Sequence, residues 1–205
     1  PCFNGDYVGC RHGGTFHVFD RLTQMLNVGL SRDVDTWALL GDNFYDPHGV
    51  LSPQFMQALS MPAKSKPMVV VPGNHDFWQH GSPHSRTGYD TYGNGYMQYW
   101  GTDTQASLAN ASMPFDFRVD PSTKEIAAAG NFFSYNMIGS LATITFSGAH
   151  HKDVMDPLFQ EACEWVKREQ PSYVFVLGHW SGVDLGCAEK MSTRDVHERI
   201  KKMPG

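Results

Sequence analysis

The fold is decided by the stretch Trp37-Ala38-Leu39-Leu40-Gly41-Asp42-Asn43-Phe44-Tyr45. It begins with an apolar run, as a short buried strand does, and continues into a glycine turn with oxygen-bearing side chains. The same arrangement recurs at residues 68–76, where Met-Val-Val-Val-Pro leads into Gly-Asn-His-Asp, and at residues 174–179, where Val-Phe-Val-Leu leads into Gly-His. Ligands at the carboxyl ends of such strands share one crevice. The pattern therefore predicts a hydrolase with two metal ions.

Three motifs in these stretches resemble successive motifs of the calcineurin-like metallophosphoesterases. They are Gly41-Asp42-Asn43-Phe44-Tyr45, Gly73-Asn74-His75-Asp76 and Gly178-His179. The tyrosine three places after Asp42 points to the purple acid phosphatase branch, especially its small tartrate-resistant type. Gly5-Asp6-Tyr7-Val8-Gly9 is similar to that branch's opening motif, Gly-Asp-x-Gly, with one residue inserted. The resemblance covers nearly the whole chain and implies an α/β fold, a β-sandwich flanked by helices in four layers (αββα).

One motif of the branch is missing from this sequence. The branch completes its metal site with Gly-His-x-His, a few dozen residues after the histidine that His179 matches, and no Gly-His-x-His occurs here. Only a stub of the first strand, Pro1–Asn4, precedes the opening motif. We therefore expect residues 1–205 to form a single metallophosphoesterase domain that is truncated at both ends, and its activity to depend on whether the missing histidines are dispensable.

The resemblance implies a set of metal ligands. Asp42 would bridge two metal ions, and Asp6 would bind the first metal alone. Asn74 would give the second metal a neutral carbonyl oxygen, and His179 would give it an imidazole nitrogen. Two cations roughly 3.5–4 Å apart acidify a bound water and clamp the phosphoryl group that is transferred.

Tyr45 distinguishes this branch within the family. A phenolate is a hard anionic donor that suits trivalent iron, so the resemblance implies that Tyr45 binds Fe(III) and that the second metal is Fe, Zn or Mn. The alternative is that Tyr45 is an aromatic packing residue beside Phe44.

Other side chains of these motifs and loops are candidates for contact with the substrate. By resemblance, Asn74 and His75 face the phosphate ester, and His75 stabilises the phosphoryl group and protonates the leaving oxygen as a general acid. Asp76 either orients His75 or caps the following turn. His150 and His151 follow another predicted strand and are weaker candidates, because ligands gather at strand ends.

The function implied is hydrolysis of phosphate monoesters by a hydroxide bound to two metals, as in purple acid phosphatases. Hydrolysis of phosphodiesters or pyrophosphate is an alternative within the superfamily, and the loops at 77–130 would set that choice. A second alternative is a non-catalytic, truncated remnant that binds a partner or a single metal.

Composition agrees with a globular α/β domain. The chain has 205 residues, 41% of them hydrophobic, which can bury a substantial core. Its net charge of -5 and the lack of a basic block argue against nucleic acid as the main partner. No apolar run approaches the roughly 18–20 residues that span a bilayer. We expect a small phosphate ester as the partner, and the resemblance implies a secreted, lysosomal or vacuolar location.

Hydrophobic periodicity predicts alternating helices and strands. A first helix, with apolar positions from Phe16 to Leu26, would stop at Gly29, and another would begin with Asp156 as its N-cap and Pro157 at its first position. The remaining predicted elements are helices at 54–59 and 189–202, strands at 67–71, 131–136, 141–146 and 173–177, and long loops with a short helix at 77–130.

Overall fold

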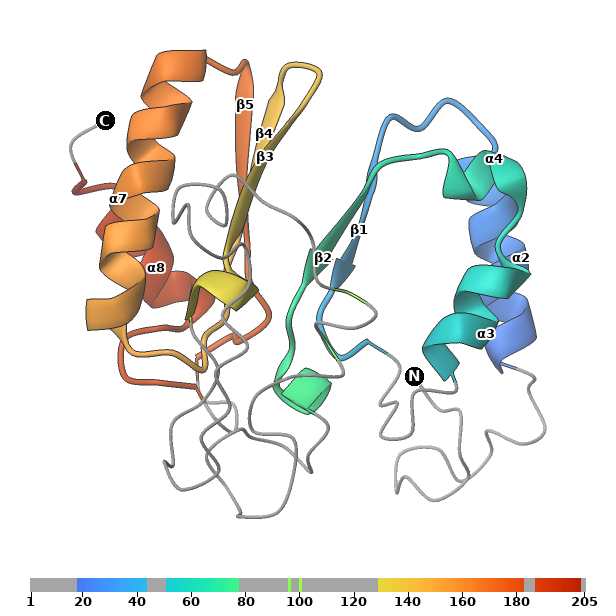
Figure 1. The fold of residues 1–205 in the computed structure, drawn as a ribbon, viewed down its shortest axis with the longest axis horizontal. Helices are drawn as coiled ribbons and strands as arrows, with labels where there is room; N and C mark the ends of the chain where they lie inside the picture. The colour runs from blue at the N-terminus through green and yellow to red at the C-terminus, as the bar shows by residue number, and fades with distance from the viewer. Residues whose placement is uncertain are drawn as a thin grey trace.

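The computed structural model describes residues 18–43, 51–77, 96, 100, 129–182 and 187–203. These residues form two small β-sheets that face each other, each with helices on its outer side (Figure 1). The layers follow the order helix, sheet, sheet, helix, which confirms the predicted α/β fold. None of the helices in this part of the chain has the length and hydropathy to cross a membrane.

The first sheet pairs β1 (Trp37–Leu40) with β2 (Met68–Val71) in parallel. Two parallel strands need a crossover between them, and helices α3 (Leu51–Ala58) and α4 (Met61–Lys64) lie in that connection. Together with α2 (Val18–Leu30) they cover the outer face of the sheet (Figure 1).

The parallel register has a direct consequence for the turns that follow the two strands. Leu40 lies opposite Val71, so both strands end at the same level. The turns that begin at Gly41 and Pro72 therefore start side by side, and the second turn enters the short 3-10 helix η2 (Asn74–Phe77).

The second sheet contains β3 (Ser134–Ile138), β4 (Leu141–Thr145) and β5 (Tyr173–Leu177) in that order. A 3-10 turn, η3 (Ala129–Phe132), precedes β3. The β3–β4 pair is an antiparallel hairpin, and β4 pairs in parallel with β5 through the long helix α7 (Lys152–Glu169). The last helix, α8 (Thr193–Ile200), lies beside α7 on the outer face (Figure 1).

Aromatic side chains form the core between this sheet and α7. Phe159 of α7 packs edge-on against Phe133, with ring centroids 5.1 Å apart, and against Phe146, with ring centroids 5.5 Å apart. All three are fully buried, as is Met155 one turn earlier in the helix. Burying side chains of this size contributes about 1.5–3 kcal/mol each, so α7 is fixed firmly on the sheet.

The loop that follows β5 connects the two halves of the molecule. Trp180 is fully buried in the hydrophobic cluster around α3, together with Phe55 of that helix. Its ring passes so close to Gly148 that a Cβ on that glycine would lie 2.8 Å from it. The residue before Trp180, His179, is thereby held over the end of the first sheet.

Several element boundaries differ from the sequence prediction. β3 begins at Ser134 rather than at residue 131, α3 begins at Leu51 rather than at residue 54, and α8 is shorter than the predicted 189–202. Two further differences have a clear physical reason. Helix α7 begins at Lys152 with His151 as its N-cap, so Asp156 is not the N-cap and Pro157 lies inside the helix. The preference of proline for the first helical position is overridden because the preceding turn buries Met155 and satisfies the His151 carbonyl, which accepts from the N–H groups of Val154 and Met155. Helix α2 likewise runs through Gly29 to Leu30.

The prediction of buried strands is confirmed for β2 but wrong for two other strands. No residue of β1 is buried, and Leu40 is 55% exposed. The strand before Gly178, β5, is exposed as well. Tyr173 and Phe175 are 66% and 54% exposed, and Val174 and Val176 are 42% and 36% exposed. β5 pairs with β4 on one side, and no other strand among the described residues pairs with its second edge. Central and edge strands can have the same apolar sequence pattern, so the periodicity of the sequence does not distinguish them.

The exposed edge of β5 predicts self-association. It carries no charge or proline, the features that blunt natural sheet edges. We expect Phe175→Lys to lower the apparent molar mass in concentration-dependent static light scattering. Val154→Lys on α7 is the matched control, since Val154 is also 54% exposed and the charge change is identical. A wild-type chain that scatters as a monomer at every concentration would contradict the prediction.

The packing of Trp180 gives a second prediction. Gly148→Ala places a methyl group against the indole, and such overpacking costs about 1–3 kcal/mol of unfolding free energy. Gly29→Ala on α2 is the control, because no atom lies within 4 Å of the place that its methyl group would take and alanine favours a helix by up to about 1 kcal/mol. Urea unfolding should therefore show opposite shifts. Equal midpoints for Gly148→Ala and wild type would show that the loop yields without strain.

Candidate metal centre

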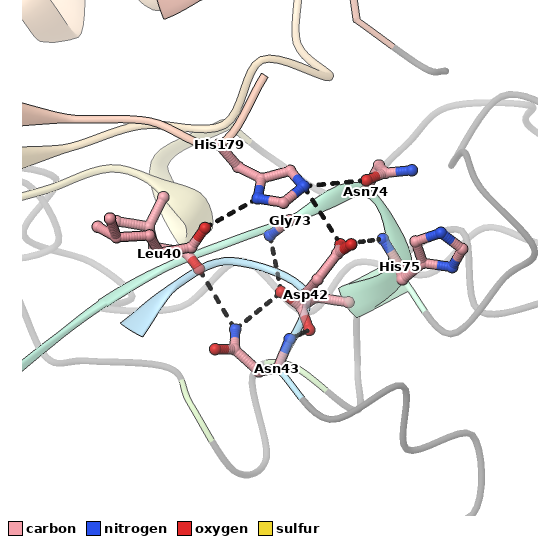
Figure 2. A network of polar contacts seen from close by, with 9 residues as sticks. Leu40, Asp42, Asn43, Gly73, Asn74, His75 and His179 are labelled. Carbon is pink, nitrogen blue, oxygen red and sulfur yellow. Dashed lines mark hydrogen bonds and ion pairs between the residues drawn. The ribbon is translucent and has the colours of Figure 1, made fainter. Parts of the chain in front are cut away.

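Three predicted ligands converge at the ends of three strands. Asp42 follows β1, Asn74 follows β2 and His179 follows β5, so the second sheet contributes one side chain and the first sheet two. His179 Nε2 lies 3.2 Å from Asn74 Oδ1 and 3.4 Å from Asp42 Oδ1 (Figure 2). Asn74 is buried, and the other two side chains are mostly buried.

The tautomer of His179 follows from its other ring nitrogen. Nδ1 lies 2.8 Å from the carbonyl oxygen of Leu40, which can only accept, so the assigned tautomer has its proton on Nδ1. In the neutral ring, Nε2 then presents a lone pair to the oxygens of Asn74 and Asp42. These three acceptor atoms can share a proton or a metal cation. The arrangement therefore favours a cation.

Glycines make this close approach possible. Gly41 has φ +86°, and a Cβ on it would lie 2.5 Å from His179 Nδ1. A Cβ on Gly73 would lie 2.5 Å from Asp42 Oδ1 and would overlap the Asp42 backbone nitrogen. Gly41 and Gly73 are thus required because the backbone of each meets a candidate ligand from another strand end.

Asp42 itself has a disfavoured backbone. Its φ is +55°, in the left-handed region that residues other than glycine seldom adopt, although aspartate tolerates it better than most. The backbone N–H of His75 donates to Asp42 Oδ1 at 3.1 Å. The carboxylate is therefore held on one side by the second turn and faces His179 on the other (Figure 2).

A buried carboxylate, Asp76, links the two turns. Its Oδ1 accepts from the backbone N–H of Asn43 at 2.7 Å, and its Oδ2 accepts from Asn43 Nδ2 at 2.8 Å and from the backbone N–H of Gly73 at 2.7 Å. Burial raises the pKa of Asp76 to about 7, whereas the N–H donors favour the carboxylate and oppose that rise.

The role of Asp76 differs from both sequence-based suggestions. It neither orients the His75 ring nor caps the turn that follows, because its oxygens face back toward Gly73 and Asn43. The contact with Asn43 joins residues 33 apart in the sequence. No local spacing signals such a pair, which depends on the register of β1 against β2.

The other predicted site residues lie in different surroundings. The His75 ring points away from the Asp42 carboxylate (Figure 2) and is half-buried. His150 is buried, with its ring centroid 5.5 Å from that of Phe132, and His151 is exposed at the start of α7. Asp6 and Tyr45 lie outside the described residues, as does most of the loop region 77–130.

The donor atoms fit part of a metal shell. Within the described ranges, no group of three or more His, Cys, Asp or Glu side chains is placed to hold a metal ion. The cluster above has two side chains of those types, Asp42 and His179, and its third donor is the amide oxygen of Asn74. Carboxylate, amide oxygen and imidazole suit divalent first-row metals. They supply three donors, so further ligands must complete the shell.

Comparison with known proteins identifies the family. The family model of the calcineurin-like phosphoesterases matches residues 5–201, which is nearly the whole chain. Searches of curated proteins and of solved structures gave no match. The family match includes all three converging side chains and the Asp76 turn. The chain therefore belongs to the calcineurin-like phosphoesterase family.

Proposed function

We propose that this chain is a metal-dependent phosphomonoesterase whose metal site contains Asp42, Asn74 and His179. The observation that carries the proposal is the convergence of three acceptor atoms, His179 Nε2, Asn74 Oδ1 and Asp42 Oδ1, from the ends of three strands, once Leu40 has fixed the histidine tautomer. Membership of the calcineurin-like phosphoesterases supports it, because the family generally binds two metal ions and acts on phosphoesters.

The three side chains differ in what they contribute. Asp42 brings a negative charge and two oxygens, so it can hold two cations at once. Asn74 brings a neutral oxygen and His179 a neutral nitrogen, which leave the site a net positive charge when metals are bound. Bound metal ions supply Lewis acidity and lower the pKa of a coordinated water. The positive charge that remains attracts the phosphate of the substrate.

His75 is the proposed general acid. Its backbone N–H is fixed by Asp42, while its half-buried ring extends away from the Asp42 carboxylate (Figure 2). A protonated imidazole there would donate its proton to the departing alkoxide and hold a phosphoryl oxygen until then. Asn74 would contact the substrate next to His75. His150 and His151 are further proposed contacts with the substrate.

The finer assignment rests on two residues of the sequence motifs. We propose Asp6 and Tyr45 as further ligands, with Tyr45 as a phenolate on Fe(III) and Fe, Zn or Mn as the second metal. The phenolate would place the enzyme in the purple acid phosphatase branch. A visible charge-transfer band in the iron-loaded protein, absent after Tyr45→Phe, would distinguish this branch from relatives that use divalent metals alone.

Asp42→Asn tests the metal site. We expect the variant to lose turnover of p-nitrophenyl phosphate and to bind Mn²⁺ more weakly. Loss of a residue that only hydrogen-bonds to a metal ligand weakens metal affinity by roughly 10–100-fold, and we expect a larger effect for a ligand itself. Calorimetric titration of the chelator-treated protein gives the affinity. Asp153→Asn, an exposed carboxylate on α7 paired with Lys152, is the control and should change neither quantity. Metal-dependent turnover that survives Asp42→Asn would refute the assignment.

His75→Gln tests the general acid. An alkyl phosphate needs its leaving oxygen protonated, whereas p-nitrophenolate leaves readily without a proton. We therefore expect kcat to fall by about 10²–10⁴-fold on the alkyl ester and much less on p-nitrophenyl phosphate. His197→Gln on α8, an exposed histidine, should leave both rates unchanged. Equal losses on the two substrates would mean that His75 does not protonate the leaving group.

A further inference from the structure

We propose that Asp76 is a positioning residue, which holds Asp42 in its left-handed backbone conformation and so directs the Asp42 carboxylate toward Asn74 and His179. The inference rests on the proposed function, because its consequence is the affinity of the site for metal. Asp76 itself does not need to touch the metal or the substrate.

The first step is the position of the donors that Asp76 binds. One is the backbone N–H of Asn43, the residue directly after Asp42, and another is the backbone N–H of Gly73, the residue directly before Asn74. A single carboxylate thus holds the peptide group that joins Asp42 to Asn43 and the one that joins Pro72 to Gly73, one residue before Asn74. Both contacts are 2.7 Å long and belong to a buried group, so water does not compete for them.

The second step is the backbone of Asp42. With φ at +55°, the peptide after Asp42 points in a direction that an ordinary extended or helical residue would not give. The N–H of that peptide is the one that meets Asp76 Oδ1. Glycine would adopt the conformation without strain, but it has no carboxylate to offer. An aspartate in this backbone conformation needs a contact from another residue to hold the conformation, and Asp76 supplies that contact.

The third step is how firmly Asp76 and Asn43 are anchored. The Asn43 amide donates to Asp76 Oδ2 at 2.8 Å and lies 3.3 Å from the carbonyl oxygen of Val71, the last residue of β2. Asn43 and Asp76 are both buried. The link between the two turns is therefore shielded from water and tied to the end of the sheet, so it transmits the strand register to the ligands.

The test compares Mn²⁺ affinity and folding stability in the full chain. Asp76→Asn replaces one carboxylate oxygen with an NH₂ group. That group cannot accept from an N–H donor, so at least one hydrogen bond is lost. We expect at least a 10-fold weaker Mn²⁺ affinity and an altered visible spectrum of the Co²⁺-loaded protein. Asn43→Ala keeps both backbone donors and should weaken binding less. Asp156→Asn breaks the 2.7 Å ion pair with Arg199, and it should lower stability in urea without changing Mn²⁺ affinity or the Co²⁺ spectrum.

The outcomes separate the inference from the function it rests on. If wild type binds Mn²⁺ and folded Asp76→Asn binds it equally well with the same Co²⁺ spectrum, Asp76 is merely structural and the inference fails while the function stands. If Asp76→Asn does not fold, Asn43→Ala decides: weaker binding supports the inference, and unchanged binding overturns it. If folded wild type binds no Mn²⁺, Co²⁺ or iron, the proposed function fails and the inference fails with it.

Discussion

The hydrogen bond between His179 Nδ1 and the Leu40 carbonyl is the interaction on which the site depends. It spans the two sheets, from the loop after β5 to the last residue of β1. It also fixes which ring nitrogen presents a lone pair to Asp42 and Asn74. Burial of Trp180, the next residue, in the cluster around α3 holds the histidine in place. The packing of Trp180 thus determines the position of His179, and the hydrogen bond to the Leu40 carbonyl determines which of its ring nitrogens can act as a ligand.

Much of this arrangement could be predicted from the sequence. The apolar runs before Gly41, Gly73 and Gly178 predicted the strands β1, β2 and β5, and the residues after these glycines do converge. Strand-end reasoning works here because it needs only the local pattern of strand and turn. The helix predicted to begin at Asp156 is likewise present, as the larger part of α7.

What could not be predicted depends on contacts between distant residues. The bond from Asn43 to Asp76 requires the register of two strands, and the Leu40 carbonyl is a backbone group with no sequence signature. The exposure of β5 depends on its place in the sheet, which the composition of the strand does not reveal. The start of α7 was misplaced because a local preference of proline was overridden by burial of Met155.

The features that shape the site are each unfavourable for the chain without metal. Asp42 has a left-handed backbone, Asp76 is an acid in a buried place, and an imidazole lone pair faces two oxygens. A cation bound among these three side chains would attract the imidazole nitrogen and both oxygens. Any ligand that binds only the folded chain stabilises it, so a metal bound at these proposed ligands would couple metal affinity to folding stability. Under that proposal, the backbone strain at Asp42 belongs to a geometry built in advance, in which the fold rather than the metal would hold the proposed ligands together.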